Sequence, residues 1–142
     1  MPKLQTRQYL APEPQFLAFP DHYVNIPGKI EFAELEKLLN TLQPAEKAKM
    51  KNVYSKEVLP RGLAVHIDGD GKVTAPVAGS ETVTAVKPNA ILFDTIEIYK
   101  HDEVTDTQVN ASILVHGFVR ADRLFGSEKA KLDNAMICVV NK

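Results

Sequence analysis

The side chains best suited to chemistry in this chain are four histidines, one cysteine and an arginine close to the last histidine. His22, His66, His101 and His116 are dispersed along the sequence. Zinc ligands normally come as closely spaced pairs, together with cysteine or carboxylate side chains. The sequence therefore predicts no metal site, and it contains no motif for a bound cofactor.

His116 and Arg120 form the most site-like pair, because both fall on one face of a predicted strand. The chain contains no G-x-S-x-G elbow, no P-loop and no dinucleotide-binding glycine motif. A surface or subunit-interface histidine is the simpler interpretation, so we expect no enzyme activity. A small-ligand site that gathers His66, His116, Asp94 or Arg120 is the alternative.

Cys138 is the only cysteine and lies in the apolar run 135–140. It has no partner for an intramolecular disulfide, and no base or cation lies nearby in the sequence. We therefore predict a buried core thiol rather than a reactive nucleophile.

The elements around these residues are organised by a strand predicted over 111–124. Alternate residues give this strand one small apolar face and one half-polar face. The apolar face comprises Ala111, Ile113, Val115, Gly117 and Val119, and the other comprises Ser112, Leu114, His116, Phe118 and Arg120. This pattern is typical of a strand that is packed inside and partly covered outside. A second strand, over 90–99, is expected to pair with it.

Further strands are predicted over 63–67 and 72–77, joined by a tight turn at 68–71, and over 81–86 and 135–140. One helical turn is predicted over 127–132. An amphipathic helix is predicted over 28–43, because five apolar residues recur at three- and four-residue steps. They are Phe32, Leu35, Leu38, Leu39 and Leu42. A short second helix is expected over 44–51.

Residues 1–27 hold five of the nine prolines, which disfavour helix and central strand. Apolar side chains are scattered among them: Tyr9, Leu10, Phe16, Leu17 and Phe19. This composition predicts an extended arm that either folds back on its own domain or docks on a partner.

We therefore predict an α+β, β-dominated fold. It would be a small β-sandwich or barrel-like domain over 28–142, with a helical segment over 28–51 and a β-rich part over 60–142, preceded by the arm. The net charge of −1 and the lack of tryptophan argue against a nucleic-acid partner. No run approaches the length of a signal-peptide core or a membrane span, so we expect a protein that does not bind membranes and is made in the cytoplasm.

The block from Pro60 to Val140 resembles bacteriophage head decoration and head fiber proteins, which are small auxiliary capsid proteins. The likeness rests on the stretch 87–92 (KPNAIL), on Asp94 and Ile96, on the stretch 114–119 (LVHGFV), and on Leu124. It covers a little over half of the chain and is a pattern of spacing.

The resemblance implies a virion protein, assembled in the host cytoplasm, that sits on the outer capsid surface as a homotrimer and stabilises the major capsid protein. The apolar arm residues Tyr9, Leu10, Phe16, Leu17 and Phe19 would bind the capsid. The half-polar strand residues Leu114, His116, Phe118 and Arg120 would form the oligomer interface. The alternatives are another virion adaptor, such as a neck, tail or fiber-attachment protein, and a small-ligand-binding β-domain.

Overall fold

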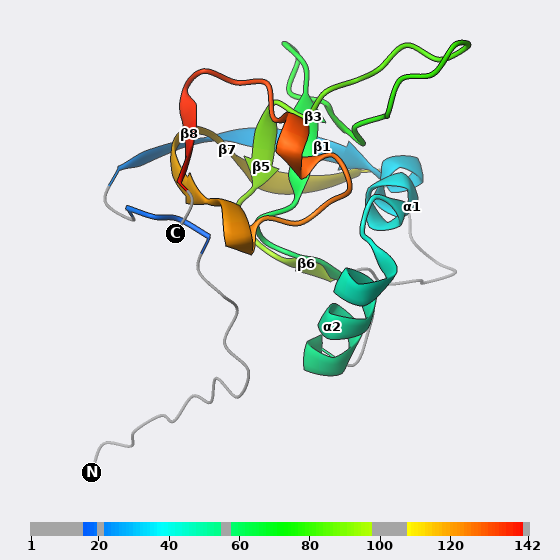
Figure 1. The fold of residues 1–142 in the computed structure, drawn as a ribbon, viewed down its shortest axis with the longest axis horizontal. Coiled ribbons are helices and arrows are strands. Elements are labelled where there is room, and N and C mark those ends of the chain that lie inside the picture. Colours follow the sequence, from blue (N-terminus) through cyan, green and yellow to red (C-terminus); the bar gives the residue numbers. More distant parts are fainter. Residues whose placement is uncertain (1–15, 20–21, 55–57, 98–107, 141–142) are drawn as a thin grey trace.

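A six-stranded sheet dominates the computed structural model, which describes residues 16–19, 22–54, 58–97 and 108–140 (Figure 1). Its strands follow the order β1 (Tyr23–Glu31), β7 (Gln108–Arg120), β5 (Ala90–Leu92), β3 (Ala64–Ile67) and β4 (Val73–Thr74). These neighbours pair antiparallel, whereas β8 (Ile137–Val140) pairs parallel with β7. A separate two-stranded ladder joins β2 (Val58–Leu59) to β6 (Ile96–Glu97). The predicted α+β, β-dominated class is confirmed.

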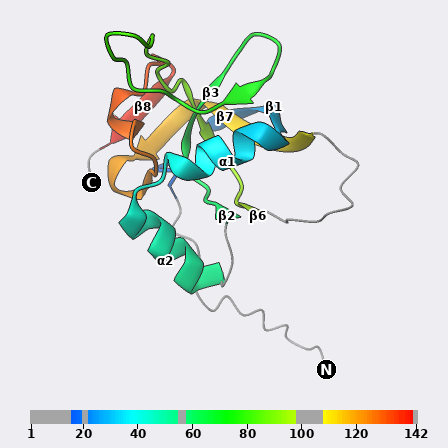
Figure 2. The same ribbon diagram turned by 90° about the vertical axis from the view of Figure 1, so that its right-hand side faces the viewer.

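The sheet curls until its two edge strands, β1 and β4, meet, which makes it barrel-like. The Lys29 N–H in β1 donates a 2.8 Å hydrogen bond to the Gly71 carbonyl beside β4. Gly28 permits this approach, since an added Cβ would lie 2.7 Å from Ile113 and 2.8 Å from Val73. The interior holds the larger core cluster, and α1 (Phe32–Asn40) covers one end of the sheet (Figure 2).

The helices differ from the prediction at both ends of the helical segment. Residues 28–31 belong to β1, because their pairing with β7 continues to the Glu31–Gln108 pair and overrides the local helical pattern. The apolar stripe is confirmed within and just beyond α1, where Leu35, Leu38 and Leu42 are buried. The second helix, α2 (Pro44–Tyr54), extends beyond the predicted 44–51. None of the described helices combines the length and apolar character needed to cross a membrane.

The predicted pairing of 90–99 with the central strand is confirmed by β5, which places Ile91 opposite Leu114. That predicted strand is nevertheless interrupted, because Asp94 lies at an exposed bend between β5 and β6. The predicted strand over 81–86 is wrong, since only an isolated bridge from Val86 to Val77 forms there. The turn at 68–71 is confirmed, and the helical turn near 127–132 is a 3₁₀ helix, Lys129–Lys131.

A β-bulge in β7 separates its two halves. Val24 pairs with His116 and the next residue, Asn25, pairs with Leu114, so Val115 is one residue in excess. An excess residue reverses the alternation of sides along the rest of the strand. Ile113 therefore packs in the barrel interior, whereas Val119 packs in a second core cluster on the other side of the sheet.

The second core cluster includes part of the predicted arm, and two further predictions are corrected nearby. Phe16 and Leu17 lie in it with exposed fractions of 0% and 4%, so this part of the predicted arm folds back on the domain. The expected boundary at residue 28 lies inside β1. Cys138 was predicted to be buried but is exposed, because β8 pairs with β7 and turns this side chain outward.

Candidate functional site

An exposed group of aromatic, histidine and valine side chains lies beside the second half of β7. We call it the His–Phe patch, and it comprises Phe19, His22, Val24, His116 and Phe118. The register places Val24 opposite His116, and the Ala18 N–H donates to the Phe118 carbonyl at 2.9 Å. Two parts of the chain that are distant in sequence thus meet on one surface.

The aromatic and imidazole rings of the patch contact one another in a row. Phe19 and Phe118 pack edge to face with centroids 5.3 Å apart, and His22 lies 5.7 Å from Phe118. The Nε2 atoms of His22 and His116 lie 3.2 Å apart. Phe19 is 55% exposed and Val24 is 50% exposed, so the patch presents apolar surface to solvent.

The structure separates the four residues predicted as an oligomer interface. His116 and Phe118 lie together in the patch and are half-buried. Leu114 is fully buried in the second core cluster, so its assignment to an interface is wrong. The bulge at Val115 is the reason, because it places Leu114 and His116 on opposite sides of the sheet. Arg120 lies at the end of β7 and pairs with Asp122 at 3.1 Å.

The structure also separates the residues predicted as arm contacts into buried and exposed ones. Phe16 packs edge to face on Phe93, and the Arg61 guanidinium lies 6.0 Å from both ring centroids. Phe16 and Leu17 are thus core residues, and the prediction that they bind a partner is wrong. Of the predicted arm contacts that the structure describes, Phe19 alone is exposed. Tyr9 and Leu10 lie outside the described residues.

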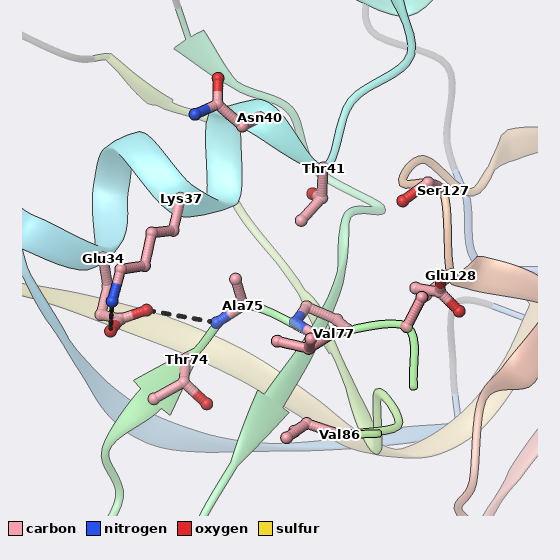
Figure 3. Close-up of a pocket in the computed structure, with 12 residues that line it drawn as sticks. Glu34, Lys37, Asn40, Thr41, Thr74, Ala75, Val77, Val86, Ser127 and Glu128 are labelled. Carbon is pink, nitrogen blue, oxygen red and sulfur yellow. Dashed lines mark hydrogen bonds and ion pairs between the residues drawn. The ribbon is translucent and has the colours of Figure 1, made fainter. Parts of the chain in front are cut away.

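An open cleft of about 560 Å³ lies between α1, the segment after β4 and the turn at 127–128 (Figure 3). Glu34 and Glu128 lie on opposite sides of it. The Glu34 carboxylate pairs with Lys37 at 3.3 Å and accepts the Ala75 N–H at 3.4 Å. Glu128 pairs with Lys131 at 3.1 Å. Both carboxylates therefore have cationic partners.

This cleft does not gather the residues expected for a small-ligand site. His66, His116, Asp94 and Arg120 are all absent from its lining. Within the described ranges, no three or more histidine, cysteine, aspartate or glutamate side chains converge in a way that could hold a metal ion. The His–Phe patch is therefore the better candidate for function.

No protein-family model matches this chain, and no curated protein matches it. The patch could not be read from the sequence, because His22 and His116 are 94 residues apart and meet only through the register of β1 with β7. The local signals that pointed to this surface were Phe19 among the prolines and the alternation that placed His116 and Phe118 on one face of the predicted strand.

Proposed function

We propose that this protein is a structural binding module of a virion, an auxiliary capsid protein that docks as a trimer on major capsid subunits. The observation that carries the proposal is the His–Phe patch. Exposed aromatic side chains that gather on one surface are typical of protein interfaces. The resemblance to head decoration proteins supplies the class of partner.

The point at which the arm joins the described fold supports the same surface. Residues 1–15 join the described fold at Phe16, two residues before the Ala18–Phe118 hydrogen bond that borders the patch. An arm that is attached next to the patch can form one continuous interface with it. Specific protein interfaces bury about 1,200–2,000 Å², which is more than five side chains supply, so the arm would contribute much of the contact.

The proposed mechanism uses binding energy alone. A protein that binds the expanded shell but not its precursor stabilises the expanded shell by mass action. Many copies, each with one interface, would reinforce the whole surface. No covalent step is needed.

A charge placed in the patch tests the proposal. Val24→Asp should weaken binding to heads assembled from major capsid protein alone by tenfold or more, about 1.4 kcal/mol, because a carboxylate would be buried against apolar surface. Val83→Asp is the matched control, since Val83 is 47% exposed and lies outside the patch. Co-sedimentation measures binding, and light scattering measures the mass in solution.

Two outcomes would contradict the proposal. One is wild-type protein that does not bind the heads, and the other is a Val24→Asp variant that binds them as tightly as Val83→Asp. The number of copies bound distinguishes a decoration protein from a neck, tail or fiber adaptor. A decoration protein saturates the shell, whereas an adaptor occupies a single vertex.

A further inference from the structure

The contact between His22 and His116 brings together two nitrogen atoms that can bind metal ions. We propose that the two Nε2 atoms form a site for a divalent transition-metal ion of the zinc type. Imidazole nitrogen is a preferred ligand of Zn²⁺, Cu²⁺ and Ni²⁺. The proposal does not depend on the proposed function, because metal binding is measured on the protein alone.

The distances fit this chemistry. Two imidazole nitrogens, each about 2.0–2.1 Å from a tetrahedral ion, lie about 3.3 Å apart, with ring centroids about 5.2 Å apart. The Nε2 atoms of His22 and His116 lie 3.2 Å apart, and their ring centroids lie 5.1 Å apart. An ion could therefore bind with little movement of either ring. Without an ion, the same contact is a hydrogen bond in which one ring donates its Nε2–H.

The backbone holds both histidines in place. His116 is fixed by its pairing with Val24, and the next residue, Gly117, pairs with Tyr23. The His22 N–H donates to the Phe19 carbonyl at 3.2 Å. The ring of Phe118 lies beside His22 and limits its rotation. A pair that is already positioned loses little conformational entropy when it binds an ion.

The surroundings indicate a site of moderate affinity. No third histidine, cysteine or carboxylate converges on the pair from the described residues. Water would fill the positions around the ion that no protein ligand occupies. The Nδ1 atom of His116 is buried and has no hydrogen-bond partner among the described residues. Histidine ligands of tight sites usually have such a partner. Mg²⁺, which prefers oxygen ligands, should not bind.

Titration calorimetry of the full chain with Zn²⁺ tests the proposal. We expect one ion per chain, with affinity reduced tenfold or more in His22→Gln and in His116→Gln, and unchanged in His66→Gln. His66 is the matched control, because its Nδ1 lies 3.1 Å from the Lys87 carbonyl, away from the patch. Cys138→Ser should also keep the wild-type affinity, since the thiol is not assigned to the site. Circular dichroism checks that each variant folds.

Proton NMR of the wild-type imidazoles gives a measurement that requires no variant. Zn²⁺ should shift the ring signals of His22 and His116 and leave those of His66 and His101 in place, and Mg²⁺ should shift none of them. Zn²⁺ that perturbs only His66 or His101 would overturn the proposal. So would no saturable binding by wild-type protein, or binding that survives both patch substitutions in folded protein.

Discussion

Gly117 permits the backbone conformation and the close packing of β7 against residues 22 and 23. Its φ is +153°, and an added Cβ would lie 3.2 Å from both the His22 carbonyl oxygen and the Tyr23 Cβ. Gly117→Ala should therefore lower the free energy of unfolding by about 1–3 kcal/mol. Gly69→Ala is the matched control, because an added Cβ there has nothing within 4 Å. Urea denaturation measures both variants, and equal stabilities would contradict the role given to Gly117.

The hairpin between β3 and β4 is an element whose stability should depend on pH. The Lys72 N–H donates to the Asp68 carboxylate at 2.9 Å, as does the Asp70 N–H. These hydrogen bonds, that of Lys72 first, hold the pKa of Asp68 below its ordinary value of 3.8. The unfolded chain then binds a proton more readily than the folded chain, so the stabilisation is present above that value and is lost as the pH falls through the folded pKa.

The prediction is tested with Asp68→Asn, which keeps hydrogen-bond acceptance but removes the charge. Wild-type protein should be more stable than this variant at pH 7, and the difference should shrink as the pH falls below about 4. Asp70→Asn is the control, since Asp70 contributes its backbone N–H to the turn. Urea midpoints at several pH values measure the effect. A difference that stays constant with pH would show that the carboxylate charge does not stabilise the hairpin.

The elements also show what the sequence could and could not predict. The apolar stripe of α1 and the pairing of β5 with β7 were predictable, because periodicity reports which side of an element is buried. The bulge was not, since β7 reads as regular alternation across Val115. Cys138 was misassigned because β8 is apolar in sequence yet turns this side chain outward. The candidate site depends on the bulge and on the register of β1 with β7. Of its five residues, only Phe19, His116 and Phe118 were predicted to take part in interactions.

For the whole molecule, the described fold should not need residues 1–15. A chain that starts at Phe16 should unfold with a free energy within about 0.5 kcal/mol of the full chain, because it retains every core side chain that the structure describes. Phe16→Ala in the full chain should instead cost about 3–5 kcal/mol, since Phe16 is fully buried. Thermal and urea unfolding measure both.

The same truncated chain also tests the proposed role of the arm. Its binding to heads should fall tenfold or more even though the domain stays folded. A truncation that unfolds the domain would show that residues 1–15 contribute to the core, and one that binds normally would remove the arm from the interface.

The excess residue at Val115 makes this position unlike any other in β7. Removing one residue elsewhere in a strand moves every later side chain to the opposite side of the sheet. Removing Val115 would instead restore regular pairing, with Val119 still in the second core cluster and Phe118 still in the patch. Loss of the codon for Val115 during evolution should therefore leave the side chains on either side of it in their places. When relatives of this chain are aligned, a one-residue gap should fall at Val115 before it falls anywhere else in the strand.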